Sequence, residues 1–162
     1  MSRVYVPSIG PSSWQALLAD PIKHWATGYS ARTLAHAWES QDGFPPEIVA
    51  MLKQHAALAN ADPLLIFPEW KVPLPGGARP SQNDVWILAK SPTDIISVAV
   101  EGKVNEPFDK TVGEWNLDRS PGKDERLQFL LAVLGLAPPI PDSIRYQLLH
   151  RAASAVIEAE RF

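Results

Sequence analysis

The most informative segment of the chain runs from Ser81 to Val104 and reads Ser81-Gln-Asn-Asp84-Val-Trp-Ile-Leu-Ala-Lys-Ser91-Pro-Thr-Asp94-Ile-Ile-Ser-Val-Ala-Val-Glu101-Gly-Lys103-Val104. Two short apolar runs, at 85–89 and 95–100, flank the segment 91–94. Runs of this length and composition are typical of strands. The segment between them has residues typical of a turn: Pro at its second position, and Ser and Asp at its two ends. The pattern predicts an antiparallel hairpin.

The turn also predicts which residues of the two strands face each other. If Ser91 faces Asp94, then Asp84 faces Glu101, because each lies seven residues farther along its strand. Facing residues of an antiparallel pair have Cβ atoms about 5 Å apart on one face of the sheet, and Lys103 shares that face by strand alternation. A slip of one residue would send Asp84 to the other face. We therefore expect two carboxylates and an ammonium group to converge.

These three side chains suggest a metal-dependent chemistry. Two carboxylates this close repel, which raises one pKa unless a cation compensates. Their hard oxygen ligands favour Mg²⁺ or Mn²⁺, which typically takes one or two carboxylates, several waters and substrate phosphates. Such an ion activates a water and stabilises a phosphoryl oxygen, while the lysine orients the water or neutralises charge. Two carboxylates, a lysine and a bound divalent ion together suit the hydrolysis of phosphodiester bonds.

Asp84 at the start of one hairpin strand and Glu101-Gly102-Lys103 at the end of the next resemble the PD-(D/E)xK nuclease superfamily. The resemblance implies that Asp84, Glu101 and the Gly102 carbonyl bind Mg²⁺ or Mn²⁺ and that Lys103 serves the attacking water. It also implies a restriction-endonuclease-like α/β (α+β) fold, a small mixed sheet flanked by helices. Asn83 stands where the family motif has Pro, and no segment matches the family's final strand well.

The chain reads as one domain, 1–162, with a helical part at 1–60 and the hairpin-containing core and C-terminal helices at 61–162. We expect helices at 14–18, 31–39 and 47–59, with Ser13 and Ser30 as caps of the first two. A further short strand is expected at 64–67. An apolar stripe begins at Leu127 and stops at Gly135, which predicts a helix there. A last helix is expected near the C-terminus, with Ser143 as its cap.

Composition sets limits on partners and compartment. The 162 residues include no Cys, which excludes disulfides and thiolate metal sites. Fifteen Lys and Arg against 18 Asp and Glu give a net charge of −3, so phosphate binding must be local. No run of 18 apolar residues exists and residues 1–7 do not resemble a signal peptide. We expect a cytoplasmic protein with no membrane partner and, from the small residues of the last helix, a homodimer.

Three further motifs have ordinary structural interpretations. Glu69-Trp70-Lys71 is a second Glu-x-Lys, but the prolines around it favour an edge or loop, and Glu69 enters the site at most as an outer carboxylate. The segment 75–80, with two glycines, lacks the end of a phosphate loop and is expected to be flexible, with Arg79 able to touch substrate. Gln147 on the last helix is loosely similar to the extra glutamine of some nuclease branches.

Two functions follow from this pattern. The first is a magnesium-dependent nuclease that hydrolyses DNA or RNA, with Asp84, Glu101 and Lys103 as catalytic residues. The second is a non-catalytic binding or interaction module that retains the nuclease-like fold, which the acidic balance favours. The sequence does not choose between DNA and RNA.

Overall fold

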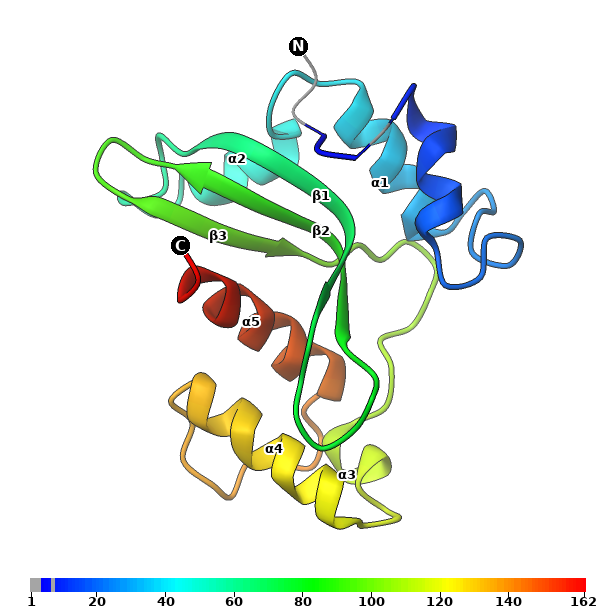
Figure 1. Ribbon diagram of the computed structural model, residues 1–162, viewed down its shortest axis with the longest axis vertical. Helices are drawn as coiled ribbons and strands as arrows, with labels where there is room; N and C mark the ends of the chain where they lie inside the picture. The colour runs from blue at the N-terminus through cyan, green and yellow to red at the C-terminus, as the bar shows by residue number, and fades with distance from the viewer. Residues whose placement is uncertain (1–3, 7) are drawn as a thin grey trace.

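The computed structural model describes residues 4–6 and 8–162 and combines helices with one small sheet (Figure 1). This confirms the expected mixed α and β class. The elements in chain order are the 3₁₀ helix η1 (Pro11–Leu17), α1 (Ser30–Glu39), α2 (Pro46–Leu52), β1 (Asp62–Val72), β2 (Ser81–Lys90), β3 (Ile95–Val100), α3 (Val112–Trp115), α4 (Pro121–Val133) and α5 (Tyr146–Ala159).

The sheet has the order β1-β2-β3, and both strand pairs are antiparallel. The expectation of a mixed sheet is met only by an isolated parallel bridge between Val4 and Ile66. Among the described residues no fourth strand follows β3, because the chain continues into α3, α4 and α5. A parallel partner needs a crossover that returns to the sheet edge, and α5 instead packs across the sheet.

The hairpin register agrees with the one predicted from the turn. Lys90 pairs with Ile95, and Val85 pairs with Val100 at the other end of the ladder. The Ser91 amide donates to the Asp94 carbonyl at 2.8 Å and closes the turn. Continued by one residue, this register sets Asp84 beside Glu101.

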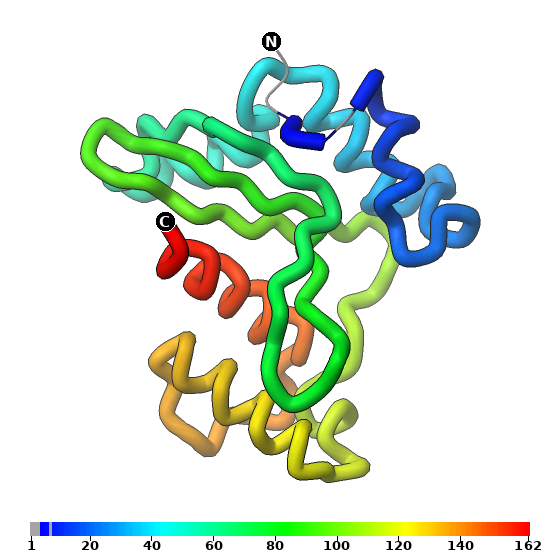
Figure 2. Tube along the Cα trace, in the orientation of Figure 1, coloured from blue at the N-terminus to red at the C-terminus, as the bar shows by residue number. Residues whose placement is uncertain are grey.

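Helices cover both faces of the sheet (Figure 2). Alternate residues of β2, namely Val85, Ile87 and Ala89, face the N-terminal helices and are fully buried there with Trp14 and Trp38. The other face packs against α5. Since both faces of β2 are covered, the strand is apolar along most of its length rather than alternating.

A second hydrophobic cluster lies at the lower end of the molecule in Figure 1. Leu130 of α4 and Tyr146, Leu149 and Ala153 of α5 pack there against Leu74, which follows β1. The cluster fixes α5 between the sheet and α4. No helix in residues 4–6 and 8–162 is long and apolar enough to cross a bilayer.

Several helix ends differ from the sequence prediction. Helix α2 ends at Leu52 instead of continuing to residue 59, and residues 53–60 form turns. Helix α5 starts at Tyr146 with no side-chain cap, so Ser143 does not cap it. The helical spacing of apolar residues can continue past the end of a helix, because apolar residues of a following turn also pack inward. Helix ends are therefore predicted less well from this spacing than the helices themselves.

The N-terminus of α1 is capped by a distant carboxylate rather than by Ser30 acting alone. Glu106 Oε1 accepts hydrogen bonds from the Ser30 amide at 2.6 Å and the Ser30 hydroxyl at 2.5 Å. Burial acts against the charged form, but these bonds and one from the Val104 amide lower the pKa of Glu106 to about 2. The cap ties the segment after β3 to α1, next to Gly102.

We predict that Glu106→Gln lowers the free energy of unfolding by about 1 kcal/mol near neutral pH, because the amide caps the helix without a charge. The folded-state pKa lies below the ordinary value of 4.5, so the contribution of Glu106 is present above that value and is lost as pH falls toward 2. Thermal melts of both proteins across this range should therefore converge in acid. A constant difference would contradict this assignment.

Candidate functional site

A cavity of about 340 Å³ opens at the end of the sheet where β2 begins and β3 ends. Asp84, Glu101 and Lys103 all line it, so the structure brings together the three side chains that the hairpin register predicted. Side chains from β1 and α5 line it as well; these are Glu69, Gln147 and Arg151.

Asp84 is an acid whose charge is poorly balanced. Its Oδ2 atom accepts a hydrogen bond from the Gly102 amide at 2.8 Å, which fastens β2 to the segment after β3. Burial and the negative charge of Glu101 together raise the pKa of Asp84 to about 6, against the opposing effects of the Gly102 amide, Arg151 and Lys103. A proton or a metal ion at Asp84 would relieve this repulsion.

Gly102 packs closely against α1. A Cβ atom at this position would lie 2.7 Å from Cδ1 of Leu34 and 3.2 Å from Cβ of Ser30, both on α1. A side chain between Glu101 and Lys103 would therefore displace the Leu34 side chain, and the backbone lies next to α1.

Glu101 accepts hydrogen bonds from three side chains. Lys103 Nζ and Gln147 Nε2 donate to Oε1 at 2.9 and 2.5 Å, and Arg151 Nε donates to Oε2 at 2.6 Å. The carboxylate is only 11% exposed, so its charge needs such partners. Two cations and an amide bind the Glu101 carboxylate and fix its orientation.

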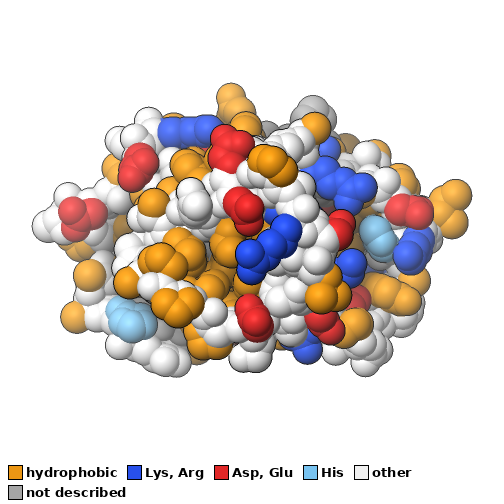
Figure 3. Space-filling view, turned by 90° about the horizontal axis from the view of Figure 1, so that it is seen from below, with side chains coloured by type: hydrophobic (Ala, Val, Ile, Leu, Met, Phe, Trp, Pro, Cys, Tyr) orange, Lys and Arg blue, Asp and Glu red, His pale blue; other side chains and the backbone are white. Residues whose placement is uncertain are grey.

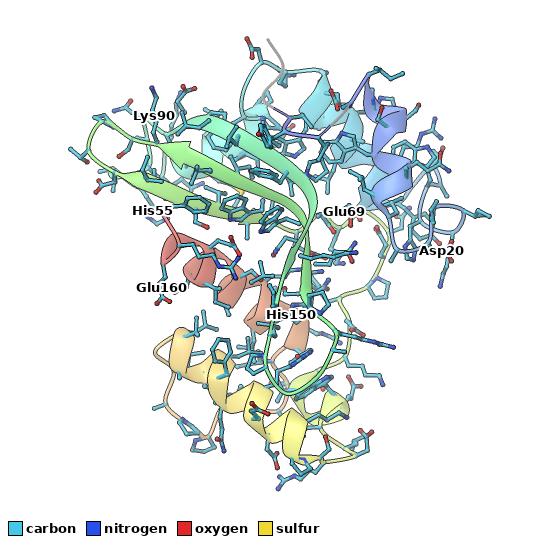
Figure 4. All side chains as sticks on the ribbon, viewed as in Figure 1. Asp20, His55, Glu69, Lys90, His150 and Glu160 are labelled. Carbon is cyan, nitrogen blue, oxygen red and sulfur yellow. The ribbon has the colours of Figure 1, made fainter. Side chains whose placement is uncertain are left out.

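Glu69 belongs to the site, although its Glu-x-Lys motif had an ordinary structural interpretation. In β1, Pro68 pairs with Val85 and Trp70 with Asn83, which sets Glu69 beside Asp84. Its φ of 53° is unusual for a residue with a side chain and marks a strained position at the bend of β1 (Figure 4). Carboxylates from β1, from β2 and from the residue that follows β3 thus lie in a row across the end of the sheet.

The environment of Glu69 favours its protonated form. Burial, together with the charges of Asp84 and Glu101, raises the pKa of Glu69 to about 7, although a hydrogen bond from Gln82 Nε2 at 2.6 Å opposes the shift. The prolines around Glu69 had favoured an edge or loop over a site. The strand tolerates them because β1 lies at the edge of the sheet.

Gln147 and Arg151 were not predicted to be site residues. They lie four positions apart on α5, so they project from the same face of the helix toward Glu101. A Gln and an Arg at this spacing on one helix face were the available signal, but only the packing of α5 on the sheet shows which carboxylate they meet.

The donor set fits a magnesium-type ion in part. Asp84 and Glu101 offer carboxylate oxygens and Gly102 a backbone carbonyl, which are hard ligands suited to Mg²⁺ or Mn²⁺. Within residues 4–6 and 8–162, however, no group of three or more His, Asp or Glu side chains is arranged to hold a metal ion. An ion bound here would therefore depend on waters or substrate phosphates for its remaining ligands.

A family model described as a domain of unknown function, DUF6946, matches residues 7–162. The chain belongs to this family. It matches no curated protein and no solved structure.

We predict that Glu69→Gln stabilises the metal-free DUF6946 protein at alkaline pH. The folded-state pKa of Glu69 is raised from 4.5 to about 7, so the protonated side chain favours the folded state. This contribution to the free energy of unfolding is fully present below pH 4.5 and is lost as pH rises through about 7. Urea unfolding of both proteins should show a gain for the variant at about pH 8 and none at about pH 4. An equal gain at both values would contradict the shift.

We predict that Arg151→Met lowers the free energy of unfolding by about 2 kcal/mol, because a mostly buried carboxylate loses one of its two cations. In the Glu101→Gln background the same substitution should cost much less. Chemical denaturation of the four proteins of this double-mutant cycle measures the coupling. Additive losses would show that the pair contributes no net interaction.

Proposed function

We propose that this DUF6946 protein is a magnesium-dependent nuclease of the PD-(D/E)xK type, which hydrolyses phosphodiester bonds of DNA or RNA. The observation that carries the proposal is the meeting of Asp84, Glu101 and Lys103 in one cavity at the ends of adjacent strands. The raised pKa of Asp84 supports it, since an unbalanced carboxylate is what a bound cation would satisfy.

In this proposal Asp84, Glu101 and the Gly102 carbonyl hold Mg²⁺ or Mn²⁺. The ion supplies a Lewis acid for a phosphoryl oxygen and favours deprotonation of the attacking water. Lys103, fixed by its bond to Glu101, orients that water or neutralises charge that develops on the phosphate. Arg151 and Gln147 act through Glu101 as positioning residues.

Basic side chains next to the cavity favour a phosphate-bearing substrate, although the protein as a whole is acidic. Lys23 and His24 line the cavity, and a wider groove that shares them with it continues past Lys110 and Arg145. In the space-filling view the Lys and Arg side chains alternate with Asp and Glu, without a continuous basic surface (Figure 3). Such a surface suits contact with a few phosphates rather than with a long duplex.

A specific observation favours the second function, a non-catalytic binding module. Glu101 already has two cations and an amide on its oxygens, so its charge is satisfied without a metal ion. A degenerate nuclease-like domain would keep such a network for stability alone. Metal binding distinguishes the two functions.

The first test is cleavage of end-labelled single-stranded and double-stranded DNA and RNA with Mg²⁺, Mn²⁺ or EDTA. We expect metal-dependent cleavage that falls by about a hundredfold or more in Asp84→Ala, Glu101→Ala and Lys103→Ala. Lys90→Ala, at the exposed end of β2, is the control and should keep full activity. Full activity in any of the three site variants would refute its assigned role.

Thermal melts with and without millimolar Mg²⁺ or Mn²⁺, repeated on Glu101→Gln, complete the test. A ligand that binds only the folded state raises its stability by mass action. A metal-dependent rise that disappears in the variant supports the nuclease. No rise, together with no cleavage of any of the four substrates, supports the binding module. A homodimer and a cytoplasmic location remain predictions from the sequence.

A further inference from the structure

A second cavity, of about 400 Å³, is lined on α5 by Tyr146 and His150 and has a different chemical character. Five separate segments of the chain line it: the loop between β1 and β2, the segment after β3, and helices α3, α4 and α5. Its polar lining comes mainly from Arg79, Lys110, Arg126, Tyr146 and His150, and Asp109 is the one acidic residue among those lining it.

The loop wall of this cavity is rigidly held. Arg126 Nε donates to the Pro75 carbonyl at 2.8 Å and Arg126 Nη2 donates to the Gly77 carbonyl at 2.9 Å. Gly76 has a φ of 74°, and a Cβ atom there would lie 1.9 Å from the Gly122 carbonyl oxygen at the start of α4. The glycine-rich loop is therefore clamped onto α4 instead of being flexible, and it carries Arg79 to the edge of the cavity.

His150 contributes a hydrogen-bond donor. Its Nδ1 atom lies 2.8 Å from the Ser81 hydroxyl and 3.4 Å from Arg151 Nη1 (Figure 4 labels His150 on α5). A proton on Nδ1 would face the Arg151 guanidinium, so Nδ1 accepts and the proton lies on Nε2. Burial and the charges of Arg151 and Arg126 lower the pKa of His150 to about 3, in agreement with a neutral ring.

The Tyr146 hydroxyl is a further sign that a ligand belongs here. Tyr146 is 6% exposed; its hydroxyl lies close to the Arg126 side chain, but its oxygen makes no hydrogen bond of good geometry with the described residues. Buried hydroxyl groups are rarely left unpaired, because water can no longer satisfy them. Since Tyr146 is one of the residues that line the cavity, an oxyanion bound there is a candidate acceptor for this hydroxyl.

The charge balance selects an anion. Neither Arg79 nor Lys110 has a side-chain ion pair or hydrogen bond with any residue in 4–6 or 8–162, so three cations face one carboxylate in a protein of net charge −3. The donors come from four segments of the chain. A phosphate group, with several oxygens that accept hydrogen bonds from Arg, Lys and neutral donors, suits such a set.

We infer that this cavity is a binding site for a phosphate group, carried either by the end of a nucleic-acid strand or by free phosphate and small phosphate esters. Arg79 and Lys110 would supply its charge, and Tyr146 and His150 would fix its orientation. The site shares no residue with the Asp84 and Glu101 cavity, although Lys110 also lines the wider groove that continues from it. Phosphate binding here does not require that Asp84 and Glu101 form a nuclease site.

Isothermal titration calorimetry with inorganic phosphate, in buffer that contains EDTA, tests the inference. We expect saturable binding that weakens about tenfold or more in the double variant Arg79→Met, Lys110→Met, and several-fold in Tyr146→Phe. The matched control removes two exposed charges elsewhere, with Lys53→Met and Lys90→Met, and should bind as the unaltered protein does. Thermal melts without phosphate check that each variant is folded.

Oligonucleotides with a 5′-phosphate or a 5′-hydroxyl then distinguish the two sources. Tighter binding of the phosphorylated strand that disappears in the Arg79→Met, Lys110→Met variant assigns the site to strand ends. Equal binding of both strands, with phosphate still bound, assigns it to free phosphate and small esters. Absence of phosphate binding, or an equal loss in the control, overturns the inference. Phosphate binding that persists in Glu101→Gln would show that this site works independently of the proposed nuclease site.

Discussion

The pairing of β2 with β3 is the constraint on which the site depends. The turn at 91–94 sets the register, and the register brings Asp84 and Glu101 to the same end of the sheet. The Asp84 carboxylate then holds the Gly102 amide, which continues the pairing beyond the last ladder residues. Because side chains alternate between faces, a shift by one residue would separate the two acids and remove the cavity's negative charge.

Charge compensation within the cavity is uneven. Glu101 has Lys103, Arg151 and Gln147 as partners, whereas Asp84 and Glu69 have mainly amide donors and the repulsion of neighbouring carboxylates. Three acids, from β1, from β2 and from the residue after β3, lie side by side, and burial of their unbalanced charge is costly. Residues that strain the fold in this way are typical of functional sites.

Helix α5 links the two cavities. Gln147 and Arg151 face the acids, His150 faces the basic cavity, and Arg151 also donates to the Ser81 hydroxyl that contacts His150. The helix is held in place by the second hydrophobic cluster, which includes Leu130, Leu149 and Ala153. Packing far from the chemistry thus determines which polar side chains reach each cavity.

The hairpin, its register and the grouping of Asp84, Glu101 and Lys103 could be predicted from the residues alone, because turn residues and strand alternation are local rules. The mixed fold class could be predicted as well. The end of α2, the cap that Glu106 gives α1 and the clamping of the glycine loop by Arg126 could not. Glu69, Gln147 and Arg151 join the acids only through the packing of β1 and α5, because these contacts join segments whose separation in the chain carries no periodic signal.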